Sequence, residues 1–459
     1  NVVSAFDRAV KPQAGPSPLV IMPEYWESNM ANGIEVIGTE NSEIPMVDIR
    51  LNFDGGHLLE ASDKYGLASL TASMMNEGTE RYSAEAFETE LDKLGSTITV
   101  SAGQEATNIR VQSLDRNLDA TLALLEERLF NSVFTEEDLT RLRQQQIESI
   151  EADKEQPSTI ASNVYRKLVY GEQHPFAVPA YGQVETLNNI SLQDIEAFAA
   201  NSLVAPVLDV IIIADLPEQE ILSKLAFLEN LPEQDIAIPD MPRSPELEGN
   251  TLYLIDKPGA PQSEIRIGYM GSLTYEPTGE YFERFLMNYV LGGAFSSRIN
   301  LNLREDKGYT YGARSSFSAT RFPGPFTASA SVRSDSTADS IVQFMTEMMQ
   351  YREQGITAEE LAFTKSAIGQ SEALDYETPR QKSSLLGQII EYDLSSDFVM
   401  QQQQIINQLS TEQVNELAQE HLPVEDMIIV VVGDKASIEE SLSMLDYEIV
   451  ELNTEGQPL

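Results

Sequence analysis

The sequence predicts an α+β fold made of two homologous domains, each a largely antiparallel β-sheet covered by α-helices on one face. Three observations predict it. Alternating, strand-like segments are mixed with long amphipathic helical segments. Strict alternation of strands and helices is absent, which disfavours a doubly wound parallel sheet. Finally, the same succession of segments occurs twice along the chain.

The repeat is visible in pairs of similar segments that are separated by 219 to 222 residues. Several matches at one shift indicate two copies of one αβ unit rather than chance similarity. The pairs are FTEEDL at 134–139 with ITAEEL at 356–361, the segments that begin at Ser191 and Ser410, the strands that end at Asp215 and Asp434, and the helical residues Asp119 and Asp339.

The repeat divides the chain into three parts. Residues 1–27 are rich in proline, which predicts an extended arm or linker. The first repeat then covers 28–240 and the second covers 241–459. Prolines interrupt any regular element in the connection around 232–250.

Within the first repeat, period-two alternation predicts strands and period-3.6 patterns predict helices. Gly66 and Gly95 mark the start of one helix and the end of the next. The region 157–182, which contains several prolines, is predicted to be irregular. The predicted strands are 33–38, 46–53, 97–102, 106–113 and 209–214, and the predicted helices are 67–78, 84–94, 117–130, 135–155 and 191–203.

Composition excludes several classes of function. The chain has 30 basic and 73 acidic residues, a formal net charge of −43, so nucleic acid and anionic lipid are disfavoured as partners. It has no cysteine, which excludes disulfides, thiolate zinc sites and cysteine nucleophiles. No apolar run is long enough for membrane insertion. Because the sequence begins at Asn1 and shows no signal-peptide pattern, we expect a mature product or a piece of a longer chain.

The most informative segment is LGGAFSSRINLNLREDKGYTYGARSS, residues 291–316. Gly292 and Gly293 predict a turn into a short helix that ends near Gly308 in a left-handed cap, and a strand follows. This layout places the guanidinium of Arg304 near a helix end and the phenol of Tyr311 on the next strand. Both are hydrogen-bond donors that could grip a carbonyl or an oxyanion. The alternative is a surface arginine and a half-buried strand tyrosine without chemistry.

The histidines do not form a metal motif. The chain has only three, His57, His174 and His421, too few for a local HxxEH pair. His57 precedes Leu58-Leu59-Glu60 and looks like such a motif without its second histidine, but it follows a strand and is predicted to lie in a loop. His174 is also predicted in a loop, and His421 at a helix C-terminus as a favourable cap for the helix dipole. The three methionines Met345, Met348 and Met349 have helical spacing and predict core positions.

The 291–316 segment resembles the second repeat of the pitrilysin-type (M16) zinc peptidases, whose pattern LGGG-x-SSRL…LRE-x-x-G-x-x-Y carries an Arg/Tyr pair that binds substrate near the scissile bond. The resemblance assigns this role to Arg304 and Tyr311. Ala294 stands where the family has a third glycine. By the same resemblance, the peptide-binding surface comprises Gly292, Gly293, Phe295, Ser296, Ser297 and Arg298.

The family binds zinc through HxxEH on the first helix of the first repeat and a glutamate farther along. Here the matching positions are occupied by Ser69, Ala72 and Ser73, and the distal glutamate corresponds to Ser149, or to Glu148 if the alignment shifts by one. Serine and alanine cannot form a zinc site of useful affinity. We therefore expect no metal in this chain and zinc in a partner subunit.

The resemblance implies a non-catalytic, substrate-binding half of an M16 peptidase. Its partner would be an HxxEH-bearing M16 subunit in a heterodimer, with self-association as the other arrangement, and its ligand a peptide substrate. The bacterial relatives are exported, which implies the periplasm. Two alternatives remain open: a purely structural M16-fold scaffold subunit, and a peptide-binding chamber without hydrolysis.

Overall fold

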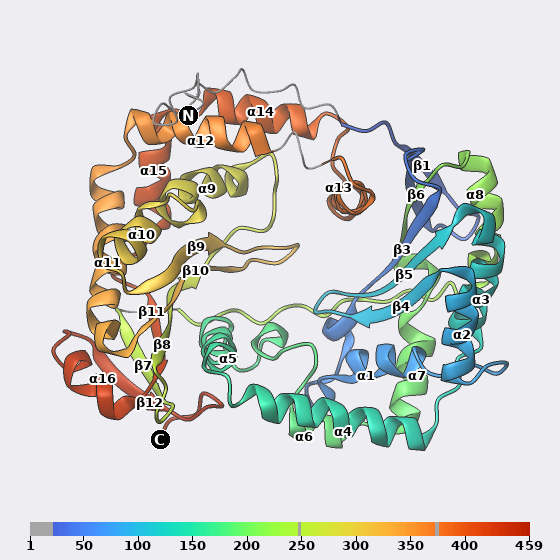
Figure 1. Ribbon diagram of the computed structural model, residues 1–459, viewed down its shortest axis with the longest axis horizontal. Helices are drawn as coiled ribbons and strands as arrows, with labels where there is room; N and C mark the ends of the chain where they lie inside the picture. The colour runs from blue at the N-terminus through green and yellow to red at the C-terminus, as the bar shows by residue number, and fades with distance from the viewer. Residues whose placement is uncertain (1–21, 247–248, 372–375) are drawn as a thin grey trace, which may run out of the picture.

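The computed structural model describes residues 22–246, 249–371 and 376–459, and it contains two six-stranded sheets, each packed with helices (Figure 1). The predicted α+β architecture is confirmed. Strands β1–β6 come from the first half of the chain and strands β7–β12 from the second.

The first sheet has the strand order β1-β2-β6-β3-β5-β4. Its neighbouring strands are antiparallel except for the parallel pair β2 and β6. The elements are β1 (Trp26–Asn29), β2 (Glu35–Glu40), β3 (Met46–Asp54), α1 (Leu67–Met75), α2 (Ala84–Leu94), β4 (Thr97–Ala102), β5 (Ala106–Leu114), α3 (Leu118–Phe130), α4 (Glu136–Asp153), α5 (Pro157–Tyr170), α6 (Val184–Asn188), α7 (Leu192–Ser202), β6 (Leu208–Ala214) and α8 (Glu218–Lys224).

The second sheet has the order β12-β7-β11-β8-β10-β9, in which β7 is parallel to both β11 and β12. The order β2-β6-β3-β5-β4 in the first sheet matches the order β7-β11-β8-β10-β9 in the second, so corresponding strands of the two repeats have corresponding positions. The elements are β7 (Thr251–Asp256), β8 (Gln262–Met270), α9 (Glu280–Asn288), α10 (Arg298–Asn300), β9 (Thr310–Phe317), β10 (Pro325–Arg333), α11 (Thr337–Gln354), α12 (Ala358–Ser371), α13 (Pro379–Tyr392), α14 (Phe398–Gln408), α15 (Thr411–His421), β11 (Ile428–Gly433), α16 (Lys435–Leu442) and β12 (Glu448–Leu452).

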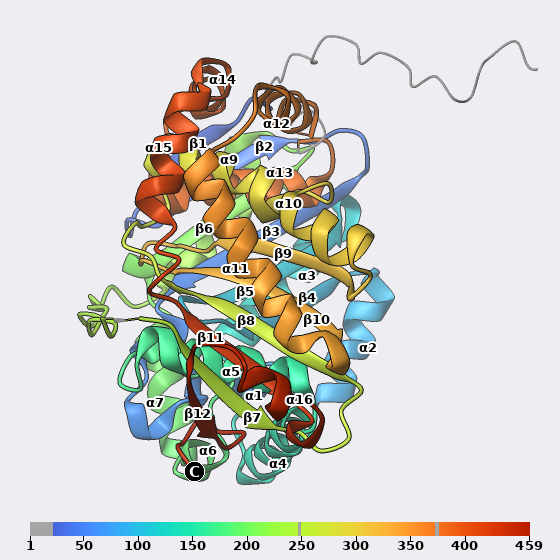
Figure 2. The same cartoon turned by 90° about the vertical axis from the view of Figure 1, so that its left-hand side faces the viewer.

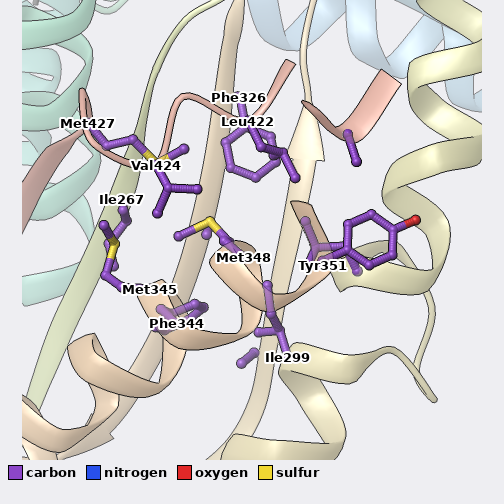
Figure 3. Packing of buried hydrophobic residues seen from close by; sticks show 14 of the residues in the cluster. Ile267, Ile299, Phe326, Phe344, Met345, Met348, Tyr351, Leu422, Val424 and Met427 are labelled. Carbon is purple, nitrogen blue, oxygen red and sulfur yellow. The ribbon is translucent and has the colours of Figure 1, made fainter. Parts of the chain in front are cut away.

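Helices cover the outer face of each sheet. Figure 1 shows α2, α3 and α8 outside the first sheet, and Figure 2 shows α11 lying across the strands of the second. Met345 and Met348 of α11 are buried in the second core among residues such as Phe344 and Ile267 (Figure 3), as predicted, whereas Met349 is exposed. Within the described ranges, none of the helices combines the length and apolar character needed to cross a bilayer.

Two helices pack on the other, inner faces, which the prediction of helices on a single face did not foresee. Helix α5 of the first half packs on β11 and β8 of the second sheet, where Ile160 and Val164 meet Ile428 and Val430. Helix α13 of the second half packs on β6 of the first sheet. Each half therefore buries apolar surface of the other, and this exchange ties the two halves together.

Most predicted elements agree with the structure to within one or two residues, but the region 157–182 does not. It was predicted to be irregular, and it begins with helix α5. Pro157 occupies the first turn of that helix, where its missing N–H needs no partner. Of the predicted arm 1–27, residues 1–21 lie outside the described residues, and Trp26 and Glu27 belong to β1.

Candidate functional site

The glycine pair lies in a π-helical turn, Tyr289–Gly293, that continues α9. A Cβ at Gly292 would lie 2.1 Å from the Oγ and 2.5 Å from the backbone N of Ser315 on β9. Gly292 is thus required for close approach to the edge strand, not for the backbone freedom that a turn was predicted to need. Helix α10 then runs into a second π-helical segment, Leu301–Asp306, and Gly308 follows with φ of +66°. The left-handed end was predicted correctly.

Two asparagines fasten these turns to β9. Asn288 donates to the carbonyl of Ser315 (2.8 Å), and the Ser315 hydroxyl donates to Asn288 Oδ1. Asn300 donates to the carbonyl of Phe295 (2.6 Å) and accepts from the N–H of Ala313 (2.9 Å). Because β9 is an edge strand, these side chains satisfy backbone groups that would otherwise lack partners. Sequence reasoning missed both, since an asparagine in a helical pattern gives no sign of such a distant contact.

Tyr311 stands at a β-bulge. The register between β9 and β10 shifts there, so that Tyr311 and Gly312 together face one residue of β10. The hydroxyl of Thr310 donates to the carbonyl of Gly312 and accepts from its N–H, which holds the bulge. A bulge re-aims side chains, and the Tyr311 side chain is 93% exposed. The Tyr311 side chain is therefore exposed, not half-buried as the alternative described.

Arg304 is held by an aromatic ring. Its guanidinium carbon lies 4.4 Å from the centroid of Phe295, a residue that is itself 73% exposed. Arg304 Nε lies 3.4 Å from a carboxylate oxygen of Glu305. Arg304 Nη1 is buried and has no hydrogen-bond partner within the described part of the chain. A buried donor without a partner is costly, so this atom is suited to a ligand or water.

Tyr311, Phe295, Gly292 and Gly293 line one pocket of about 450 Å³. Arg304 is not in its wall, but its guanidinium covers the Phe295 ring. The rest of the wall consists of Glu264, Arg266, Ala294, Asn300, Gly312, Ala313, Arg314, Ser329, Ala330 and Ser331.

The other predicted peptide-binding residues divide into two groups. Ser296 is exposed beside the pocket. Ser297 is only 1% exposed. Arg298 donates from Nε and Nη2 to the two carboxylate oxygens of Glu360 (2.7 Å each) and from Nη2 to the carbonyl of Gly355. The Arg298 guanidinium also lies over Tyr351. Burial of Ser297 and the ion pair of Arg298 give these two residues a structural role, and their contact with a peptide stays a prediction.

The residues that the family resemblance places at the zinc-ligand positions do not have the side chains of zinc ligands. Ser69 and Ser73 are half-buried on α1, Ala72 is buried, and the Ser73 hydroxyl donates to the Ser69 carbonyl (2.9 Å). Ser149 and Glu148 are exposed on α4, which packs against α1. Hydroxyl and methyl groups with at most one carboxylate do not provide the imidazole and carboxylate donors that zinc requires.

His57 was predicted to lie in a loop, and the structure places it, fully buried, in a short 3₁₀ helix, Gly56–Leu59. Its Nε2 donates to the carbonyl of Pro175 (3.0 Å) and its Nδ1 shares a proton with Glu60 (2.8 Å). Glu60 also accepts from the N–H groups of Gly66 and Ala68 at the start of α1. Burial raises the pKa of Glu60. The pair therefore anchors the start of α1, and the polar atoms of both side chains are bound to other groups of the protein.

The remaining histidines are structural as well. His174 is buried and accepts from the N–H of Phe176, and burial lowers its pKa. His421 ends α15 and lies 2.9 Å from Glu280, while burial and the nearby Arg284 lower its pKa. Its position in the last turn of α15 agrees with the prediction that His421 lies at a helix C-terminus. Glu280, Glu420 and His421 lie close enough together to surround a cation. Glu280 already accepts a hydrogen bond from the guanidinium of Arg284, which supplies a positive charge at this cluster.

Comparison with known sequences identifies the class. The model described as "Insulinase (Peptidase family M16)" matches residues 36–175, and "Peptidase M16 inactive domain" matches residues 189–368. Together they span most of both halves, and the chain belongs to peptidase family M16.

Individual relatives are similar over nearly the whole chain. The chain is 25% identical to the "Non-peptidase homolog YmxG" of Helicobacter pylori, covering 90% of this chain and 94% of that protein. It is 22% identical to the "Uncharacterized zinc protease YmxG" of Bacillus subtilis, covering 89% and 98%. Among solved structures, the "peptidase M16 inactive domain from Pseudomonas fluorescens" has a TM-score of 0.82 at 25% identity, covering 89% and 98%. The first half of the periplasmic protease PqqL from Escherichia coli has a TM-score of 0.73 at 16% identity, covering 92% and 97%.

Proposed function

We propose that this chain is the non-catalytic, substrate-binding partner of an M16-type zinc peptidase, and that it presents Arg304 and Tyr311 to a zinc site carried by another subunit. One observation carries the proposal. The zinc-ligand positions are serine and alanine, while the Arg/Tyr positions keep a buried guanidinium donor without a partner and a phenol that is 93% exposed.

The two side chains are suited to stabilising negative charge. A guanidinium and a neutral phenol both donate hydrogen bonds, and donors fixed before the reaction stabilise a developing oxyanion without reorganisation. The ring of Phe295 fixes the guanidinium, and the Thr310 hydroxyl fixes the bulge that directs Tyr311 outward. The activated water and the metal would come from the partner, an HxxEH-bearing M16 subunit in a heterodimer. In this proposal the chain itself needs no cofactor.

The relatives support this division of labour. The Helicobacter pylori relative is named a non-peptidase homologue, and the Pseudomonas fluorescens structure is described as an inactive domain. The chain covers only 49% of the full PqqL chain, so a protein of this size is similar to one half of a longer M16 protease. A second half on a separate chain would complete the comparable unit. The description of PqqL as periplasmic also supports a periplasmic location for this chain.

The test is reconstitution with an HxxEH-bearing M16 subunit encoded by the same organism. We expect Arg304→Ala to lower kcat/KM for peptide cleavage by about 10²–10³-fold, the usual loss for one oxyanion donor. Tyr311→Phe removes only the hydroxyl and is expected to act in the same direction. The control is Arg333→Ala, at the end of β10, where Arg333 is exposed and pairs with Asp335.

The outcomes separate the alternatives. Cleavage by the Arg304→Ala complex at the rate of the unaltered complex would indicate a scaffold subunit whose pair has no chemical role. Peptide binding without any cleavage, with every HxxEH partner, would indicate a binding chamber.

A further inference from the structure

A row of polar side chains crosses the second sheet beside Tyr311. Arg314 on β9 faces Ser329 on β10, and Ser329 in turn faces Arg266 on β8. Directly opposed residues on neighbouring strands have their Cβ atoms about 4.5–5.5 Å apart. All three residues line the same pocket as Phe295 and Tyr311. The row therefore extends the surface on which the Arg/Tyr pair lies.

The two arginines of this row differ in their partners. Arg266 is neutralised by Glu264, to which it donates at 3.0 Å, and it also donates to the carbonyl of Ile265. Arg314 is exposed and forms no ion pair or hydrogen bond with any residue that the structure describes. The row thus carries one positive charge in excess. In a chain with a net charge of −43, an unpaired cation in a pocket wall is available to an anion from outside.

The surroundings of Arg314 suit a carboxylate. Ser329 and Ser331 supply hydroxyl donors, and Gly312 leaves space because it has no side chain. Arginine binds carboxylates through two parallel hydrogen bonds, which a free guanidinium can offer without breaking an existing pair.

The inner face of the first sheet also carries a paired and an unpaired arginine, here on adjacent strands. Arg50 on β3 faces Arg110 on β5. Arg110 is paired with Asp48 (2.7 Å), whereas Arg50 donates to Asn108 and has no carboxylate partner among the described residues. The face away from the outer helices thus includes, in each sheet, an arginine without a carboxylate partner near one that is paired.

We propose that Arg314, supported by Ser329 and Arg266, is a specificity subsite that binds a carboxylate of the peptide held at Arg304 and Tyr311. The substrate class is then peptides with an acidic side chain, or a free C-terminus, close to the peptide bond that Arg304 and Tyr311 bind. The subsite deepens the proposed function and rests on it for the role of the Arg/Tyr pair.

Binding to the purified full chain tests the subsite directly. Three fluorescently labelled peptides of equal length are compared by anisotropy at low salt: one with two central glutamates and an amidated C-terminus, one with two glutamines instead, and one with glutamines and a free C-terminal carboxylate. Because the net charge of the chain repels anions, tighter binding of an acidic peptide indicates a local group that attracts its carboxylates. We expect an acidic peptide to bind about tenfold more tightly than the neutral one, with a smaller difference at high salt.

The variants assign the effect to Arg314. Arg314→Ala should remove the preference, and Arg333→Ala, on the same sheet but outside the pocket, should keep it. Preference for the glutamate peptide identifies an acidic side chain as the ligand, and preference for the free carboxylate identifies a C-terminus. Equal binding of all three peptides, no binding of any of them, or a preference that survives Arg314→Ala would each overturn the subsite.

Failure of the subsite is distinguishable from failure of the proposed function. If Arg304→Ala abolishes cleavage by the reconstituted pair while acidic and neutral peptides bind and are cleaved equally, only the subsite fails. If Arg314 selects acidic peptides but Arg304→Ala leaves cleavage unchanged, only the role of the Arg/Tyr pair fails.

Discussion

The two sheets end in similar corners that serve different purposes. In the first, Asn76 at the end of α1 donates to the carbonyl of Val100 on the edge strand β4 and accepts from its N–H. In the second, Asn288 at the end of α9 binds Ser315 on the edge strand β9 in a similar way. The scaffold of helix, asparagine and edge strand is thus common to both halves.

The two halves differ in whether the polar groups of the segments beside these helices already have partners. Near α1, the carboxylate of Glu60 is fully engaged by His57 and by two backbone N–H groups. Near α9, Arg304 keeps a donor without a partner and Tyr311 extends into solvent. One corner uses its polar groups for stability and the other leaves them for a ligand. Substitutions in the first should therefore change folding, and substitutions in the second should change recognition.

The largest effect on stability is expected at Glu60. Glu60→Ala leaves His57 buried without its partner and removes the acceptor at the start of α1. Each buried polar group left without a partner costs about 1–3 kcal/mol of unfolding free energy, and Glu60 is the partner of His57 and of the N–H groups of Gly66 and Ala68. Urea denaturation measures the change.

The matched control for Glu60 is Ser83→Ala. Ser83 caps α2 from an exposed position, and its loss should cost only about 1 kcal/mol. If Glu60→Ala is no more destabilising than Ser83→Ala, the first corner does not depend on the buried pair.

A smaller effect is expected where the second corner is most tightly packed. Gly292→Ala places a methyl group against the backbone of Ser315 and should lower the unfolding free energy by about 1–3 kcal/mol. It should also displace the loop that carries Phe295, and so weaken peptide binding. Gly293→Ala is the control, because the nearest atom to its Cβ would be 3.3 Å away. Equal stability of the two variants would contradict the close contact with β9.

Sequence patterns predicted the elements of this fold because each depends on local periodicity and on glycine punctuation. The helix 84–94 before Gly95 and the strand 209–214 are examples. Helix α5 was missed because Pro157 was taken as an interruption, although proline fits the first turn of a helix.

The site was predictable only in part, because its geometry depends on contacts between distant residues. Motif spacing pointed to Arg304 and Tyr311. It could not reveal the bulge that exposes Tyr311, the ring of Phe295 beneath Arg304, or the ion pair with Glu360 that engages Arg298. Nor could it distinguish His57 in a loop from His57 buried against a residue more than a hundred positions away.

The most direct test of a division of labour between two subunits is to measure zinc content and peptidase activity on the purified chain, on an HxxEH-bearing partner, and on their complex. We expect the isolated chain to contain no stoichiometric zinc and to cleave no peptide, and the complex to cleave peptides in a reaction that a chelator stops. Chelator-sensitive cleavage by the isolated chain, with zinc bound at one equivalent, would contradict the division of labour.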